Sequence, residues 1–71
     1  MSKTFSGKQV VKALRKLGYE HLYTKGSHAV MLNKFLRIKV IVPLHRELKT
    51  GLLLSILKKV GITIKNLKEL I

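Results

Sequence analysis

Two stretches with the apolar spacing of an amphipathic helix enclose a middle segment rich in β-branched residues. In each stretch, apolar side chains recur at intervals of three and four residues, which gives a helix one face to bury. These positions are Val10, Val11, Leu14 and Leu17 in the first stretch and Leu53, Ile56, Leu57 and Val60 in the second. A chain of 71 residues can build only one small core. Both helical faces must therefore pack against the same middle segment.

Local signals mark the ends of the first helix. Ser6 and Gln9 have the spacing of a capping box, in which each side chain binds the backbone amide of the other residue. Gly18 follows the last apolar position, where glycine commonly ends a helix. The pattern predicts a helix from about Gly7 to Leu17.

The second helix is expected after a loop at Leu44–Lys49, and Gly61 is expected to close it. Thr63 has the side chain of an N-cap residue. It predicts a short terminal helix over Ile64–Leu70.

The middle segment predicts three short strands, at Tyr19–Lys25, His28–Asn33 and Ile38–Val42. Pro43 should end the third strand, because proline cannot donate a hydrogen bond to a sheet. We expect one α+β domain over residues 1–71: a three-stranded antiparallel sheet with two helices on one face and a short helical tail. Because strand side chains alternate between faces, we expect His28 to point outward and Ala29 and Met31 to point toward the helices.

The balance of charge limits the classes of partner and of functional site that the chain can have. Fifteen Lys and Arg oppose three Glu, which gives a formal charge of +12, and there is no Asp or Cys. Such a chain attracts polyanions, with nucleic acid as the first expected partner class and an anionic membrane surface as the second. The lack of Cys excludes a disulfide scaffold and a thiolate metal site. Three scattered Glu and three His in no ligand spacing favour neither a metal nuclease nor any other metal or cofactor site.

No apolar run approaches the roughly 20 residues of a membrane span. The first five residues do not resemble a signal peptide. We therefore expect a cytoplasmic protein.

Four sequence pieces, in this order, resemble the HicA family of toxins from prokaryotic toxin–antitoxin pairs. They are Gly7-Lys8-Gln9-Val10-Val11, Leu17-Gly18-Tyr19, Lys25-Gly26-Ser27-His28, and Val40-Ile41-Val42-Pro43-Leu44-His45 with its continuation to Lys58. The resemblance implies a double-stranded-RNA-binding-domain-like fold, ribonuclease action on mRNA and inhibition by a HicB-like antitoxin. It also implies that His28, in the Gly-Ser-His signature, is the catalytic residue.

The chain departs from the family pattern at two places. Relatives usually carry glycine in the turn between the second and third strands, where this chain has Asn33 to Arg37. Leu52 and Leu54 replace residues that are often polar. These leucines are either a contact surface for a partner or additional core.

Histidine is the side chain best suited to general acid–base chemistry near neutral pH, so His28 could activate the 2′-hydroxyl of RNA without a metal. Gly26 and Ser27 would support it through close backbone approach and a positioning hydroxyl. His45 is a second acid–base group, a phosphate contact or an ordinary loop residue. His21 is expected to have no functional role.

Two further sets of side chains are candidates for contact with RNA. Tyr19 and Tyr23 are expected to share one strand face, and they serve either in base stacking or in packing. The expected phosphate contacts are Lys8, Lys12, Arg15, Lys16, Lys25, Arg46 and Lys49.

The sequence thus predicts a metal-independent endoribonuclease toxin that cleaves mRNA through His28. Its expected partners are mRNA and a HicB-like antitoxin that covers His28. A non-catalytic RNA-binding module remains the alternative, because that fold also binds duplex RNA by shape. A membrane-active cation is disfavoured by the ordered helix and strand signals.

Overall fold

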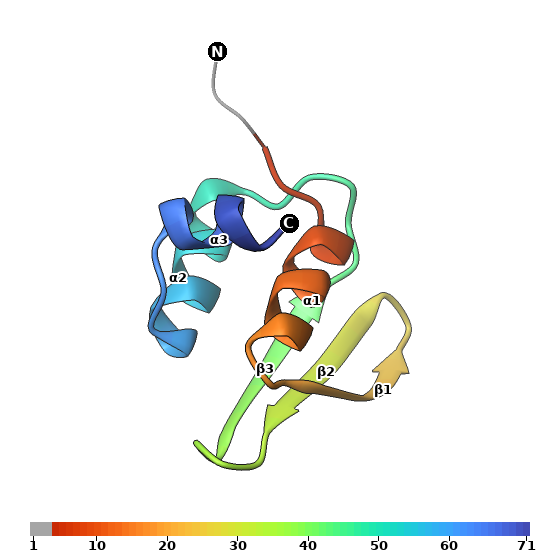
Figure 1. Cartoon of the computed structure of the whole chain (residues 1–71). Helices are drawn as coiled ribbons and strands as arrows, with labels where there is room; N and C mark the ends of the chain where they lie inside the picture. Colours follow the sequence, from red (N-terminus) through yellow and green to blue (C-terminus); the bar gives the residue numbers. More distant parts are fainter. Residues whose placement is uncertain (1–3) are drawn as a thin grey trace.

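A computed structural model describes residues 4–71 and confirms the predicted order of elements. Residues 1–3 lie outside the described residues. The expectation that the first five residues do not form a signal peptide falls partly on them. The elements are α1 (Gly7–Lys16), β1 (Glu20–Lys25), β2 (His28–Asn33), β3 (Ile38–Pro43), α2 (Thr50–Val60) and α3 (Ile64–Leu70). Figure 1 shows α1 crossing the sheet, with α2 and α3 packed beside it.

The predicted capping box at the start of α1 is present. The Gln9 amide donates to the Ser6 hydroxyl at 3.1 Å, and the Ser6 amide donates to the Gln9 side chain at 2.9 Å. At the other end Leu17 is the C-cap and Gly18 follows with φ 94°. The helix is therefore one residue shorter than predicted, because Leu17 already leaves helical geometry.

The ends of the other two helices also follow the sequence signals. Gly61 closes α2 in the left-handed conformation with φ 87°. Thr63 and Asn66 form a second capping box at the start of α3, with both bonds at 3.1 Å. In the described chain no helix combines the length and the apolar character needed to cross a membrane.

The sheet is antiparallel, with β2 between β1 and β3. Pro43 is the last residue of β3 rather than the residue after it, which an edge strand tolerates because one side of its backbone needs no partner. The strands are otherwise as predicted, except that β1 begins at Glu20 rather than Tyr19.

The core lies between the sheet and the helices. Ala29 and Met31 of β2 are buried, with exposures of 1% and 0%, and they face the helices as predicted. Val40 and Val42 of β3 pack on the same side, against the apolar faces of α1 and α2. These contacts confirm the α+β fold with two helices on one face of the sheet. Leu52 and Leu54 are exposed on α2, so they are not additional core.

A β-bulge between His21 and Tyr23 changes which face β1 presents. His21 pairs with Met31, whose side chain faces the helices, whereas Tyr23 pairs with Val30 on the outer face. The prediction that Tyr19 and Tyr23 share a face was therefore wrong. Tyr19 is 4% exposed, and within residues 4–71 its hydroxyl has no hydrogen-bond partner. Burial raises the pKa of this phenol.

The turn between β2 and β3 forms without glycine. Asn33 is buried, accepts a hydrogen bond from the Leu36 amide at 3.0 Å and donates to the Leu17 carbonyl at 3.4 Å. Arg37 takes the left-handed conformation with φ 56°, which costs an ordinary residue about 1–2 kcal/mol. The Asn33 bonds hold the turn and join it to the end of α1.

Gly7 brings the start of α1 against the loop that follows β3. A Cβ atom at this position would overlap the Pro43 carbonyl oxygen and lie 2.8 Å from the Leu44 Cα. The Gly7 amide donates to the His45 carbonyl at 2.9 Å, and the Leu48 amide donates to the Phe5 carbonyl at 2.8 Å. Glycine is needed here for space, because the backbones touch.

We expect Gly7→Ala to lower the free energy of unfolding by about 1–3 kcal/mol or more, because the added methyl group meets backbone that cannot move aside. Thermal unfolding followed by circular dichroism measures the change. Gly51→Ala in α2 is the matched control, since its Cβ meets nothing within 4 Å. Alanine should there stabilise the helix by up to about 1 kcal/mol. Equal melting temperatures for the two variants would contradict the close approach at Gly7.

Candidate active site and basic surface

His28 and His45 come together on the surface of the molecule. Their ring centroids lie 6.4 Å apart, with the rings edge-on at 70°. Both side chains are exposed. His28 is the first residue of β2 and faces outward as predicted, whereas His45 lies in the loop after β3. The fold thus joins two histidines that are 17 positions apart in the sequence.

Backbone hydrogen bonds on both sides hold this pair in place. The Leu44 amide donates to the Ser27 carbonyl at 2.6 Å, which ties the loop of His45 to the turn before His28. The Gly7 amide binds the His45 carbonyl itself. The position of the His45 ring therefore depends on α1 as well as on the sheet.

The turn before His28 needs glycine for its backbone conformation. Gly26 has φ 60°, and a Cβ at this position would meet nothing within 4 Å. Glycine adopts this left-handed geometry without the steric cost that other residues bear. Ser27 contributes its carbonyl oxygen to the loop contact with Leu44, a role that residue type alone does not reveal.

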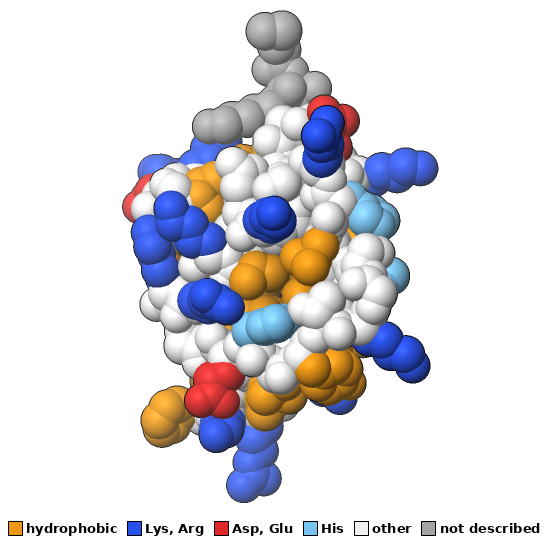
Figure 2. Space-filling model, turned by 90° about the vertical axis from the view of Figure 1, so that its right-hand side faces the viewer, with side chains coloured by type: hydrophobic (Ala, Val, Ile, Leu, Met, Phe, Trp, Pro, Cys, Tyr) orange, Lys and Arg blue, Asp and Glu red, His pale blue; other side chains and the backbone are white. Residues whose placement is uncertain are grey.

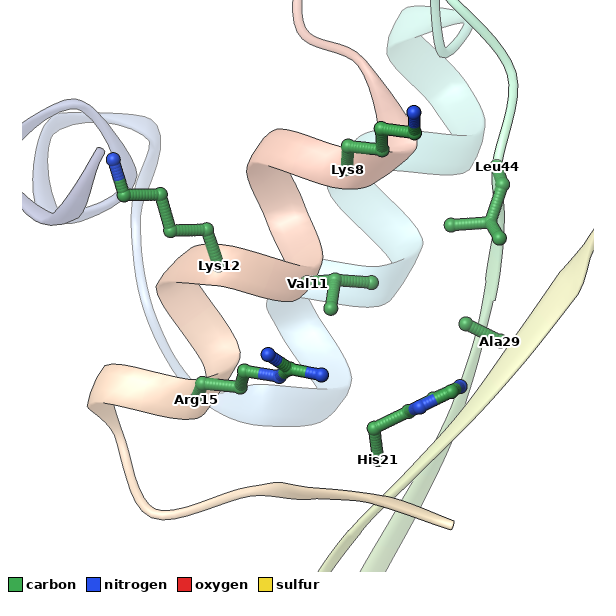
Figure 3. Close-up of a pocket in the computed structure, with 7 residues that line it drawn as sticks. All are labelled: Lys8, Val11, Lys12, Arg15, His21, Ala29 and Leu44. Carbon is green, nitrogen blue, oxygen red and sulfur yellow. The ribbon is translucent and has the colours of Figure 1, made fainter. Parts of the chain in front are cut away.

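A cationic hollow lies between α1 and the sheet, with a volume of about 210 Å³. Figure 2 shows its apolar floor, with Lys or Arg side chains above it and to its left and a His side chain below it. In Figure 3 the Arg15 and Val11 side chains point from α1 toward the sheet. The residues that line the hollow are Lys8, Val11, Lys12, Arg15, His21, Ala29 and Leu44.

Three of the predicted phosphate contacts, Lys8, Lys12 and Arg15, share this cationic hollow. Like charges at neighbouring positions on a helix destabilise it by about 0.2–0.5 kcal/mol per pair. An anion bound among them would remove this repulsion. The arrangement therefore favours a polyanion on this side of α1.

His21 was expected to have no functional role, but the structure places it at the rim of the cationic hollow. Its Nε2 lies 2.7 Å from the Thr24 hydroxyl, and in Figure 3 its ring extends toward Ala29. His21 pairs with Met31, whose side chain faces the helices, whereas Tyr23 beyond the β-bulge lies on the outer face. The sequence of β1 contains no signal that predicts this bulge. His21 is therefore a binding candidate that sequence analysis missed.

The remaining basic candidates do not gather in the cationic hollow. Lys25 pairs with His28 across the β1–β2 turn and lies on the outer face of the sheet. Arg46 and Lys49 are exposed between β3 and α2, and Lys49 is the N-cap of α2. Lys16 is exposed in the last turn of α1.

The acidic side chains form no cluster that resembles a metal site. Within residues 4–71, no group of three or more His, Asp or Glu side chains is placed to hold a metal ion. Glu20 forms an ion pair with Lys34 at 3.3 Å, with both side chains largely exposed. The described surface is therefore dominated by cations with little local compensation.

We expect a variant with Lys8, Lys12 and Arg15 replaced by Ala to bind a single-stranded oligonucleotide more weakly. Each lost phosphate contact should reduce the slope of log K against log salt by about 0.7, or about 2 in total. Fluorescence anisotropy titrations at several salt concentrations measure the slope. The control replaces exposed Lys58, Lys59 and Lys65 by Ala, with the same change in net charge. If the two variants lost the same slope, the cationic hollow would have no special role.

A family model described as the HicA toxin of bacterial toxin–antitoxin matches residues 7–62, which span α1 to the end of α2. Among curated proteins, none matches the chain. The match covers more than half of the 71 residues and includes both histidines of the exposed pair. The chain therefore belongs to the HicA toxin family and is the toxin member of a bacterial toxin–antitoxin pair.

Proposed function

We propose that this toxin is a metal-independent endoribonuclease that cleaves mRNA, with His28 and His45 as its acid–base pair. The observation that carries the proposal is the 6.4 Å approach of the two exposed rings. General acid–base catalysis needs one group to remove a proton and another to supply one. Two imidazoles on opposite sides of one phosphodiester meet this need near neutral pH.

RNA supplies its own nucleophile for this reaction. One imidazole accepts the proton of the 2′-hydroxyl as the 2′-oxygen attacks phosphorus. The P–O5′ bond breaks, and the other imidazole, in its protonated form, donates a proton to the leaving 5′-oxygen. The products are a 2′,3′-cyclic phosphate and a 5′-hydroxyl, and the two histidines have exchanged their protonation states. No metal-bound water is required for any of these steps.

Positive charge around the pair supports the same chemistry. Lys25 faces His28 across the turn, and Arg46 follows His45 directly in the chain. Fixed cations beside a reacting phosphate stabilise the charge that develops in the transition state. The cationic hollow on α1 would hold a more distant part of the strand through its phosphates.

A HicB-like antitoxin would inhibit this toxin by covering the histidine pair. Both rings are exposed, so a partner can reach them without unfolding the domain. An acidic protein surface would also neutralise part of the +12 charge that attracts RNA. One contact surface would then block catalysis and weaken the attraction of RNA.

We expect His28→Ala and His45→Ala each to slow cleavage of a purified mRNA about 10²- to 10⁴-fold. The double variant should be little slower than the worse single variant, because residues that act together in one step give non-additive losses. Single-turnover cleavage in EDTA, with end-group analysis for the cyclic phosphate, measures these rates. Circular dichroism checks that the variants remain folded.

Two results would contradict the proposed function. One is cleavage by His28→Ala at the wild-type rate, which would show that His28 is not a catalytic residue. The other is loss of all cleavage in EDTA by the wild-type protein, which would require a metal. Salt-sensitive RNA binding without cleavage would instead identify a non-catalytic RNA-binding module.

We expect a bound antitoxin to protect His28 and His45 from diethyl pyrocarbonate while it blocks cleavage. Mass spectrometry of the modified peptides measures the reactivity of each imidazole, and the free toxin gives the reference. His21, on the α1 side of the sheet, reports how far the covered surface extends. Blocked cleavage with unchanged reactivity of His28 would show that the antitoxin acts elsewhere.

A further inference from the structure

The outer face of the sheet carries an apolar hollow beside His28. The outer hollow has a volume of about 440 Å³ and is lined by Tyr23, Lys25, Gly26, His28, Val30 and Ile41. An antiparallel sheet covered on one face usually presents polar side chains on the other. Here Tyr23 and Ile41 are 50% and 54% exposed, whereas Val30 between them is 4% exposed. This outer face therefore departs from the expected polar surface at the candidate active site.

The strand register brings these side chains together. Tyr23 pairs with Val30, and Val30 pairs with Ile41, so the three lie side by side across the sheet. The β-bulge between His21 and Tyr23 turns the tyrosine to this face and not toward α1. Bulges next to active sites commonly serve to aim a side chain.

We propose that the outer hollow binds one unstacked nucleobase of single-stranded RNA, with the Tyr23 ring stacking on it, next to the phosphodiester that reacts at His28. This proposal rests on the proposed ribonuclease function and specifies that the site accepts single-stranded RNA. Tyr23 is then a positioning residue for the substrate. A base held here would fix the attached ribose and its 2′-hydroxyl relative to the imidazole pair.

Several features favour RNA in the outer hollow. His28 is one of the residues that line the outer hollow. A group bound there while His28 acts on the RNA would therefore be part of the same RNA. Its charged lining residue is Lys25, and no carboxylate lines it to repel phosphate. An aromatic ring beside a cation is the usual combination for holding single strands, because every base can stack. A base inside a duplex is already stacked and cannot enter, so the geometry favours single-stranded substrate.

The test compares Tyr23→Ala with Tyr23→Phe in cleavage of a single-stranded oligoribonucleotide and of the same sequence in a duplex. Tyr23→Ala should lower kcat/KM about 5- to 140-fold, the range that loss of one stacked base produces. Tyr23→Phe keeps the ring and should retain near wild-type activity. Phe35→Ala is the control, because this ring is 96% exposed in the β2–β3 turn and does not line the outer hollow. The duplex should be cleaved poorly by every variant.

A second measurement observes the tyrosine directly, without catalysis. In a Tyr19→Phe background Tyr23 is the only tyrosine, and the chain has no Trp. Binding of an uncleavable 2′-deoxy oligonucleotide should quench its fluorescence. The same oligonucleotide with abasic positions should bind without this quenching.

Cleavage by Tyr23→Ala at the wild-type rate, together with unchanged tyrosine fluorescence, would overturn the stacking role. Equal cleavage of duplex and single strand would overturn it as well. Loss of antitoxin binding alone in Tyr23→Ala would assign the outer hollow to a protein partner and also overturn the proposal. If the wild-type protein cleaved no RNA, the proposed ribonuclease function would fail instead, and the fluorescence measurement would still test the stacking role, so the two failures are distinguishable.

Discussion

The close approach of two backbones at Gly7 is the contact on which the histidine pair depends. With no side chain at this position, the first turn of α1 packs directly on the Pro43–His45 segment and binds its carbonyl. A second backbone bond joins the same loop to the turn before His28. His45 is thus held from both the helix layer and the sheet layer, although the loop contains no regular structure. A core this small contributes only about 3–5 kcal/mol to the stability of the fold. A few backbone hydrogen bonds therefore have a large influence on the geometry of the loop that holds His45.

The sheet separates two surfaces with different chemistry. On the helix side, Lys8, Lys12, Arg15 and His21 surround a small apolar floor, which suits a phosphate chain. On the outer side, His28 lines the outer hollow and lies close to His45, and this is the place where the proposed substrate would bind with a base and its scissile phosphate. The +12 charge favours a polyanion on either side. The cationic hollow and the outer hollow lie on opposite faces of the sheet, with His28 at the outer one.

Local sequence signals predicted the elements well because the interactions that end them are also local. Both capping boxes join residues three positions apart, and the glycines after α1 and α2 adopt positive φ within the turn itself. The inward orientation of Ala29 and Met31 followed from strand alternation, since β2 is regular along its length. Departures were confined to single residues at boundaries, such as Leu17 and Pro43.

The order of the elements, the basic character of the surface and the Gly-Ser-His motif can all be read from the amino-acid sequence. The tertiary structure decided which side chains meet. The bulge in β1 places Tyr23 on the face opposite to Tyr19 and His21, because one extra residue reverses the faces of a two-residue repeat. The approach of His45 to His28 likewise depends on hydrogen bonds between distant segments, at Gly7 and at Ser27. Such contacts form only when distant segments of the chain fold together, so the spacing of residues along the sequence does not predict them.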